Sequence, residues 1–227
     1  MITIGLICEG VSEINIMTRI ISKYLDEEPF INPIEPDTRV ERGHLVQNGY
    51  GGWMQVLRHC NDETITNILE YNDYLVIQID SDASIQPIYG VTPFNADGSS
   101  KEIPVLYNDI MNRLQMNLSK EILEKYYGRL LFAICINEIE CWLLQLYYTD
   151  RNRCKTHNCI FSLNKALSRK NMGCININDK NNSNTREVYT KVLKNFRNRQ
   201  SIQECAQYQY SFVKLLEQLD LVNDHKR

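Results

Sequence analysis

The chain has 227 residues, of which 43% are hydrophobic and 23% are charged, a composition typical of a soluble globular protein. No apolar run approaches the roughly 20 residues of a membrane-spanning helix, so the sequence excludes an integral membrane protein of that kind. The net charge of -3 is unevenly divided, because residues 1–150 carry 10 Lys or Arg against 22 Asp or Glu, whereas residues 151–200 carry 12 against 2. An acidic body joined to a basic segment suggests a polyanionic partner.

The beginning of the chain and its cysteines bear on the cellular compartment. Residues 2–7 are too few for the hydrophobic region of a signal peptide, so we expect a cytoplasmic protein. In that compartment the eight cysteines should be reduced thiols. Cys154, Cys159 and Cys174, with His157, could instead supply four zinc ligands, although their spacing is not that of a standard zinc finger.

Residues 2–8 form a short apolar run that predicts a buried strand, and an amphipathic helix is expected to follow to about residue 26. Glu9 stands at the carboxyl end of this strand beside Gly10, which permits close approach, so Glu9 is a candidate ligand. Glu13 falls in the first turn of the helix. It either complements the helix dipole or takes part in chemistry, and the sequence leaves both interpretations open.

The next segment is less regular. We expect a poor strand within residues 32–40 and a flexible loop at residues 44–52, which hold three glycines after Gly43. This loop matches no phosphate-binding spacing, which favours a plain surface loop. Helical spacing follows over residues 53–69, with a possible break near Asp62.

The most informative stretch is residues 74–84. An apolar run interrupted only by Gln78 ends in Asp80, Ser81 and Asp82, which predicts a strand buried on both faces, as in parallel sheets. Asp80 and Asp82 then lie at the carboxyl end, where open α/β sheets bind their ligands. Their oxygens suit a hard divalent cation. The alternative is that Asp80 starts a turn and Asp82 is a solvated loop residue.

A long loop at residues 85–102 precedes a helix predicted over residues 104–127 and a third buried strand at residues 130–136. Glu138 and Glu140 follow in a helix that starts near residue 138. Because Glu138 and Glu140 are two residues apart in a helix, their side chains point about 200 degrees from each other, so only one of them can face a given site.

The basic part of the chain is expected to form a helical extension, residues 151–227, packed on an α/β domain of residues 1–150. Residues 161–170 predict a short helix, residues 171–184 are Asn-rich and expected to be disordered, and residues 202–219 predict a last amphipathic helix. A helix over residues 185–199 has an apolar side and a cationic side. The candidate nucleic-acid-binding residues on or beside the cationic side are Arg186, Lys191, Lys194 and Arg197. A merely solvated charged face is the alternative.

Three apolar strands therefore end in acidic residues, and parallel strands place such ends along one edge of the sheet. Converging carboxylates repel one another unless a cation binds them, and Mg²⁺ or Mn²⁺ is the simplest candidate. With a basic surface nearby, the sequence predicts metal-dependent chemistry on nucleic acid.

The stretches CEGVSE and IDSDA resemble the TOPRIM domain shared by topoisomerases, primases and OLD-family nucleases. NEIECWLL and TREVYTKVL are similar to segments of small stand-alone bacterial TOPRIM-like proteins, including RloB-like proteins tied to abortive infection and phage defence. The resemblance implies a TOPRIM-like, mostly parallel sheet flanked by helices. It also implies that Glu9, Asp80 and Asp82 bind Mg²⁺, and an E-x-W-L motif selects Glu140 over Glu138.

By this resemblance the protein would be a Mg²⁺-dependent nuclease acting as an anti-phage effector. Glu140 would complete the metal site or orient water, and Glu13 would be a secondary ligand or base. The chain has no ATPase motif of the G-x-x-x-x-G-K-[ST] type, so an ATPase or another sensor would come from a separate protein. Two alternatives stay open: a non-catalytic nucleic-acid-binding or signalling module, and a small-molecule phosphotransferase.

Overall fold

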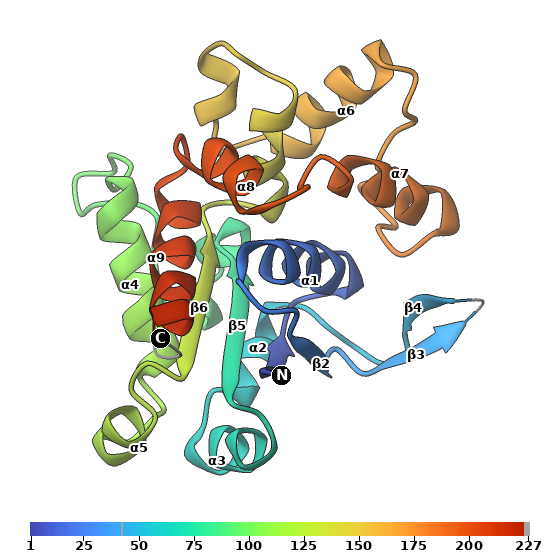
Figure 1. Ribbon diagram of the computed structural model, residues 1–227. Coiled ribbons are helices and arrows are strands. Elements are labelled where there is room, and N and C mark those ends of the chain that lie inside the picture. Colours follow the sequence, from blue (N-terminus) through green and yellow to red (C-terminus); the bar gives the residue numbers. More distant parts are fainter. Residues whose placement is uncertain (42, 225–227) are drawn as a thin grey trace.

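The computed structural model describes residues 1–41 and 43–224 and confirms the α/β class (Figure 1). Its centre is a four-stranded sheet in the order β2-β1-β5-β6, in which all neighbouring strands are parallel. The strands are β1 (Thr3–Ile7), β2 (Phe30–Glu35), β5 (Tyr74–Asp80) and β6 (Leu130–Cys135). Strands β5 and β6 are buried along their whole length, as their unbroken apolar runs predict.

Helices cover both faces of the sheet. On one face lies α1 (Val11–Tyr24), which connects β1 to β2. The opposite face is covered by four helices: α2 (Trp53–His59), α3 (Asp62–Tyr71), α4 (Ile103–Gln115) and α5 (Lys120–Lys125). The chain runs from β1 outward to β2 and from β5 outward to β6, so the strand order reverses between β1 and β5. Open α/β sheets bind ligands at such a switch point, outside the carboxyl ends of the strands.

Alternation along β5 decides which side chains reach which face. Leu75, Ile77 and Ile79 pack into the core formed with α2, α3 and α4, whereas Val76 packs into the core on the α1 face. Because successive side chains of a strand point to opposite faces, Gln78 and Asp80 share the α1 face with Val76.

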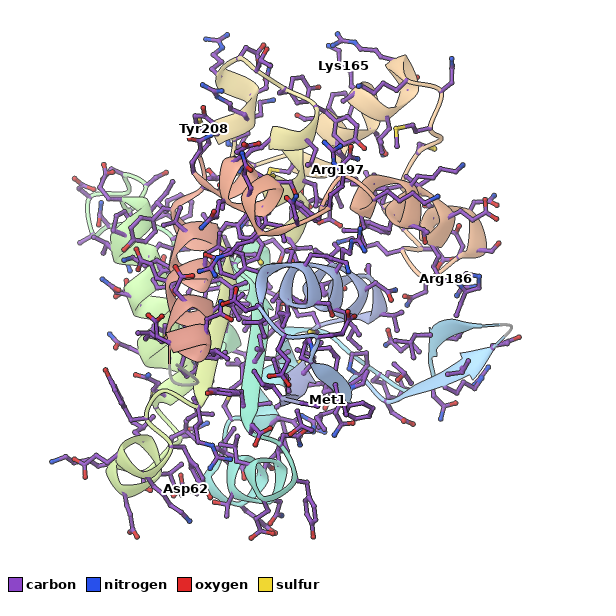
Figure 2. All side chains as sticks on the ribbon, viewed as in Figure 1. Met1, Asp62, Lys165, Arg186, Arg197 and Tyr208 are labelled. Atoms are coloured by element: carbon purple, nitrogen blue, oxygen red, sulfur yellow. A yellow bond between two sulfur atoms is a disulfide. The ribbon has the colours of Figure 1, made fainter. Side chains whose placement is uncertain are left out.

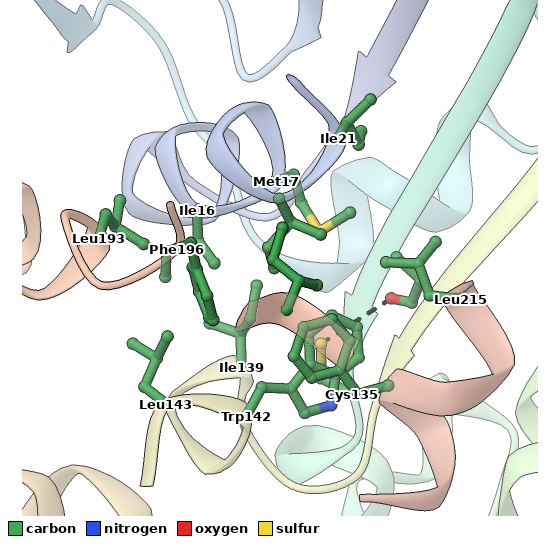
Figure 3. Close-up of a cluster of buried hydrophobic side chains, with 14 of the residues drawn as sticks. Ile16, Met17, Ile21, Cys135, Ile139, Trp142, Leu143, Leu193, Phe196 and Leu215 are labelled. Carbon is green, nitrogen blue, oxygen red and sulfur yellow. Dashed lines mark hydrogen bonds between the residues drawn. The ribbon is translucent and has the colours of Figure 1, made fainter. Parts of the chain in front are cut away.

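The C-terminal part returns to the sheet and shares its core. Two 3₁₀ helices, η3 (Ile139–Leu146) and η4 (Arg151–Cys154), lead into α6 (Cys159–Arg169), α7 (Ser183–Leu193), α8 (Arg199–Ala206) and α9 (Tyr210–Asp224). Trp142 of η3 stacks on Phe212 of α9 with ring centroids 4.5 Å apart, in the apolar cluster shown in Figure 3. The predicted extension is therefore packed on the α/β part through one continuous core.

Helix α9 also covers the edge of the sheet. The side chain of Gln218 accepts a hydrogen bond from the backbone N–H of Phe132 at 2.8 Å and donates one to its carbonyl at 3.0 Å. An edge strand with unpaired backbone groups invites pairing with another chain, and Gln218 satisfies two of these groups on β6.

Several predicted helices and loops differ from the structure. The helices expected over residues 104–127, 185–199 and 202–219 are each interrupted. Ser119 and Asn198 are the reason in the first two cases, since each accepts a backbone N–H with its side chain and thereby starts a new helix, α5 or α8. The expected loop at residues 44–52 contains β4 (His44–Gln47), which pairs in a hairpin with β3 (Thr38–Glu41).

The Asn-rich segment at residues 171–184 is not the structureless stretch that we expected. Asn164 of α6 exchanges two hydrogen bonds with the backbone of Ile175, and the N–H of Asn176 donates to the Thr185 hydroxyl. Amide side chains form such local bonds to backbone groups readily. This segment carries Lys180, whose position is described below.

Two cysteines also depart from expectation. Cys141 of η3 and Cys159 of α6 form a disulfide, although we expected all eight cysteines to be reduced. Packing of η3 against α6 brings their Cα atoms to 4.9 Å. The predicted zinc set is not assembled, because Cys159 is paired in this way and Cys154 and Cys174 are exposed free thiols. Within the described residues, every helix is too short or too polar to cross a lipid bilayer.

Candidate acidic site at the carboxyl edge of the sheet

Glu9 and Asp80 meet at the switch point between β1 and β5. Glu9 follows the end of β1, and Asp80 is the last residue of the neighbouring parallel strand β5. The Glu9 carboxylate accepts a hydrogen bond from the backbone N–H of Asp80 at 2.6 Å. The two candidate ligands are thus neighbours, as the strand pattern predicts.

Gln78 links these two acids, and the sequence analysis assigned it no role. Its amide nitrogen donates to Asp80 Oδ1 at 2.7 Å, and its amide oxygen accepts from the backbone N–H of Glu9 at 3.2 Å. Gln78 is fully buried. A polar residue that interrupts an apolar strand was the signal for such a role, because a buried amide needs hydrogen-bond partners.

Three glycines shape this edge around Glu9 and Glu13. A Cβ atom on Gly10 would lie 2.6 Å from Glu13 Oε2, so a larger residue would displace that carboxylate. The N–H of Gly52 donates to the Glu9 carbonyl at 2.7 Å, and a side chain on Gly51 would collide with the same carbonyl. The glycines of the loop after β4 therefore position Glu9.

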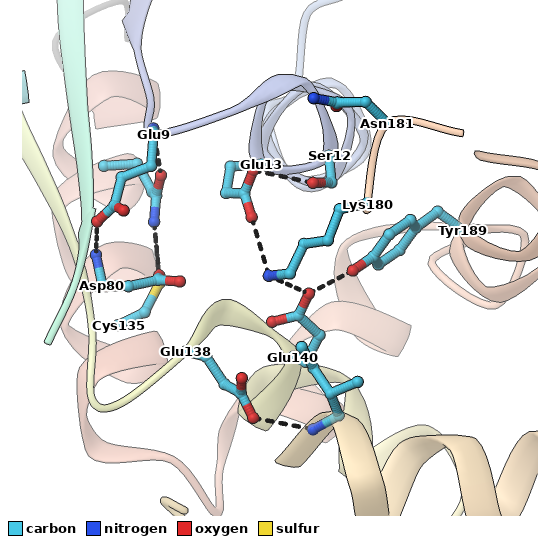
Figure 4. A network of polar contacts seen from close by, with 12 residues as sticks. Glu9, Ser12, Glu13, Asp80, Cys135, Glu138, Glu140, Lys180, Asn181 and Tyr189 are labelled. Carbon is cyan, nitrogen blue, oxygen red and sulfur yellow. Dashed lines mark hydrogen bonds and ion pairs between the residues drawn. The ribbon is translucent and has the colours of Figure 1, made fainter. Parts of the chain in front are cut away.

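A second group of acids surrounds Lys180 (Figure 4). Lys180 Nζ lies 2.8 Å from Glu140 Oε1 and 3.4 Å from Glu13 Oε1. Glu13 also accepts a hydrogen bond from the Ser12 hydroxyl at 2.9 Å, and the hydroxyl of Tyr189 donates to Glu140. Glu140 is completely buried, so the contacts of Lys180 and Tyr189 replace the hydration of its Oε1 atom, whereas Oε2 has no hydrogen-bond partner among the described residues.

Neither Lys180 nor the hydroxyl role of Tyr189 was predicted. Lys180 lies in the Asn-rich segment that we expected to be disordered, and Tyr189 was assigned to the packing side of its helix. Tyr189 is indeed buried, but its ring also carries a donor into the acidic group. No local sequence pattern reports these contacts, because they join residues 40 or more positions apart.

Glu138 lies outside this group. Its carboxylate accepts the backbone N–H of Ile160 at 2.9 Å in the first turn of α6, where a negative charge is favourable. The structure therefore turns Glu140, and not Glu138, toward the other acids.

Asp82 begins the 3₁₀ turn that follows β5. It is the first residue of η1 (Asp82–Ile85), is exposed, and lines a surface pocket with Asn137 and His157. Its backbone N–H donates to the Asn137 carbonyl at 2.9 Å. Partial desolvation of its carboxyl group still raises its pKa.

The buried carboxyl groups have strongly shifted affinities for protons. Burial, with repulsion from Glu13 and Asp82 added, raises the pKa of Glu9 to about 8, although the N–H of Asp80 opposes this shift. Burial and the neighbouring Glu9 raise the pKa of Asp80 well above its usual value. Burial alone would lower the pKa of Lys180, but Glu140 and Glu13 raise it above its ordinary value. The site therefore contains one cation of its own, Lys180, and its carboxyl groups Glu9 and Asp80 bind protons more tightly than ordinary carboxyl groups do.

The donor set fits a hard divalent cation in its chemistry, because buried carboxylates that repel one another gain most from such an ion. Glu9 and Asp80 are the two residues placed to hold it. The oxygens of Glu9, Asp80 and Asp82 do not all lie within 4.8 Å of one another, so the arrangement does not present them together as ligands of one ion. Among the residues that the structure describes, the set that meets this distance is Glu138, Cys141 and Cys159, whose two sulfurs are joined as a disulfide.

The predicted nucleic-acid-binding residues divide between two places. Arg186 and Lys194 lie on the side of α7 that faces the β3–β4 hairpin, where both line a pocket. Lys191 is exposed on α7 and does not line this pocket. Arg197 lies beyond the end of α7 (Figure 2).

Comparisons of this chain with protein-family models, with curated proteins and with solved structures find no match. The candidate function therefore depends on the geometry and chemistry of the site itself.

Proposed function

We propose that the protein is a divalent-metal-dependent nuclease that hydrolyses phosphodiester bonds of DNA or RNA, with Mg²⁺ or Mn²⁺ as its cofactor. The observation that carries this proposal is the pairing of Glu9 with Asp80 at the switch point of a parallel sheet. The Asp80 side chain is buried, Glu9 is half-buried, and both have raised pKa values, so a bound cation would relieve an unfavourable arrangement. A metal ion in such a site polarises a phosphoryl oxygen and activates water.

The protein's own residues would divide the remaining tasks. Glu9 and Asp80 would hold the metal, with Asp82 approaching from η1. Lys180 is a cation between Glu13 and Glu140, so it could offset negative charge on a phosphate that reaches this edge. Tyr189 and Ser12 would keep the two glutamates oriented. The resemblance to small TOPRIM-like proteins makes an anti-phage role, with a separate ATPase or sensor, part of this proposal.

The direct test is cleavage of labelled DNA and RNA by the purified protein with Mg²⁺ or Mn²⁺. Asp80→Asn should abolish cleavage without unfolding the protein, because asparagine keeps an oxygen that can accept the bond from Gln78. Asp62→Asn is the matched control, since Asp62 begins α3 at the opposite edge of the sheet. Cleavage that persists both in Asp80→Asn and in the presence of a chelator would refute the proposal.

One observation favours a second function, a nucleic-acid-binding or signalling module without catalysis. Lys180 already neutralises part of the acidic group, and the oxygens of Glu9, Asp80 and Asp82 do not all lie within 4.8 Å of one another. Calorimetric titration with Mn²⁺ at pH 8 separates the two functions. Heat of binding that Asp80→Asn removes supports the nuclease, whereas nucleic-acid binding without any metal binding supports the module.

A further inference from the structure

A basic pocket lies beside the acidic site, between α1, α7 and the β3–β4 hairpin, with a volume of about 440 Å³. Three side chains with permanent positive charge line it: Arg19 from α1, and Arg186 and Lys194 from α7. His44 of the hairpin closes another side. Arg19 has no recognisable sequence pattern, because it is an isolated cation on the acidic half of the chain.

The pocket is electrostatically one-sided. No carboxylate lines it, and none of its three permanent cations forms an ion pair with any residue in the described part of the chain. Cations held together without counter-charges repel one another, so an anionic ligand would be bound favourably. If these cations were only the solvated charged face of α7, there would be no reason for Arg19 of α1 to line the same pocket.

The two guanidinium groups are held in place by the backbone. Arg19 Nε donates to the Leu193 carbonyl at 3.2 Å, and Arg186 Nη1 donates to the Asn181 carbonyl at 2.7 Å. A guanidinium has five N–H donors, so each group keeps others for a ligand. Groups that are already oriented lose less conformational entropy when they bind an anion.

One residue joins this pocket to the acidic site. Tyr189 lines the pocket, while its hydroxyl donates to Glu140 at the acidic edge. Arg186, Thr190 and Lys194 line the pocket at four-residue spacing, and the neighbouring Tyr189 turns its hydroxyl to Glu140, so this helix contacts both the pocket and the acidic site. A phosphate bound in the pocket would therefore neighbour, along the same strand, the phosphate that lies at the acidic site.

We propose that Arg19, Arg186 and Lys194 form a phosphate-binding subsite that holds the backbone of a nucleic-acid strand next to its cleavage point. This inference rests on the proposed function for the identity of the ligand and extends it by assigning the strand a defined path. Of the four predicted nucleic-acid-binding residues, it assigns Arg186 and Lys194 to the subsite and leaves out Lys191 and Arg197, which do not line the pocket.

The test measures binding of a short fluorescein-labelled single strand, as DNA and as RNA, to Asp80→Asn protein in EDTA, where no cleavage occurs. Arg19→Glu and Lys194→Glu should each weaken binding about tenfold or more. Neutral Arg19→Gln should lower the salt dependence of log K by about 0.7 for the lost single-strand phosphate contact. Lys191→Glu has the same charge change on the same helix and should weaken binding much less. Lys194 is exposed, so Lys194→Glu should fold normally, as thermal unfolding will show.

The outcomes separate the possible errors. Equal weakening by Lys191→Glu and Arg19→Glu would overturn the subsite, because the effect would then be general electrostatics. If a nucleoside monophosphate binds in an Arg19-dependent manner while the labelled strand does not bind, the strand assignment is wrong and the ligand is a free nucleotide. Arg19-dependent binding in a protein that never cleaves with Mn²⁺ would defeat the proposed nuclease and leave the subsite standing. Cleavage that depends on Asp80, together with strand binding that is unchanged in the Arg19 and Lys194 variants, would support the nuclease and overturn the subsite.

Discussion

Lys180 Nζ lies 2.8 Å from Glu140 Oε1, and the two residues come from segments on opposite sides of α6 in the sequence. The contact places a cation from the Asn-rich segment against a fully buried carboxylate at the carboxyl edge of the sheet. It also reaches Glu13 at the start of α1. This ion-pair group therefore ties the segment between α6 and α7 to η3 and to α1.

Lys180→Met should destabilise the protein by about 3–5 kcal/mol at pH 7, because it leaves the buried Glu140 without its charge partner. The free energy of unfolding in urea measures this loss. The double variant Lys180→Met/Glu140→Gln should recover much of it. Lys214→Met, which breaks an exposed pair with Glu217, should cost about 1 kcal/mol or less. Equal losses in the two lysine variants would show that the Lys180 contacts do not form in solution.

The raised pKa of Glu9, about 8, predicts how stability depends on pH in a chelating buffer. Between the unfolded value near 4.5 and about 8, the folded protein binds more protons at Glu9 than the unfolded chain does, so stability should fall as pH rises through this range. Glu9→Gln cannot ionise and should become more stable than the wild type by on the order of a few kcal/mol at pH 8. The difference should vanish below pH 4.5. Glu41→Gln, the same substitution at an exposed position on β3, is the control.

Metal affinity should depend on pH for the same reason. Glu9, whose pKa is raised to about 8, holds a proton at neutral pH, and the pKa of Asp80 is shifted in the same direction, so a bound cation must compete with protons at these carboxyl groups. If binding of one Mn²⁺ ion releases one proton, the Mn²⁺ affinity should rise about tenfold per pH unit. This rise should level off near pH 8, where Glu9 loses its proton without metal. Calorimetry in buffers of different ionisation enthalpy measures the proton release directly. Affinity that is constant between pH 6 and 8 would contradict the assignment of these two acids as ligands.

The Cys141–Cys159 disulfide predicts the number of accessible thiols in the denatured protein. Thiol titration without reductant should detect six of the eight cysteines, and all eight after reduction. Because the bond closes a loop of 18 residues, Cys159→Ser should lower stability by about 3 kcal/mol under oxidising conditions. Cys174→Ser, at an exposed free thiol, is the control. Eight thiols without reductant would mean that these cysteines are reduced, as the sequence alone predicts.

Gln218→Leu should leave backbone groups of the edge strand β6 without hydrogen-bond partners, while a side chain of similar size still covers them. It removes the partners of the Phe132 N–H and carbonyl, at a cost of about 1–3 kcal/mol for each buried group left unsatisfied. We expect a lower midpoint in urea and faster aggregation on heating. Gln203→Leu on α8, whose amide contacts only the Tyr24 hydroxyl at 3.4 Å, should cost much less. Equal midpoints for both variants would show that Gln218 does not protect the edge.

Local patterns in the sequence were sufficient for the central strands and their acidic ends. The buried runs that end near Glu9 and Asp80 identify parallel strands, because only strands covered on both faces are apolar throughout. Once those strands are neighbours, the meeting of the two acids follows. Gln78 was also visible as a polar interruption, although its partners were not.

Only the tertiary structure decided which distant groups complete the site. Lys180, Arg19 and Tyr189 carry no local pattern of function, and each acquires its role from an element packed against it. The same holds for Cys141 and Cys159, which η3 and α6 bring together. The periodicity of apolar residues shows which face of a helix or strand is buried. The charged and hydrogen-bonding partners of a residue depend instead on how distant elements pack against one another, and a single sequence contains no local pattern for that packing.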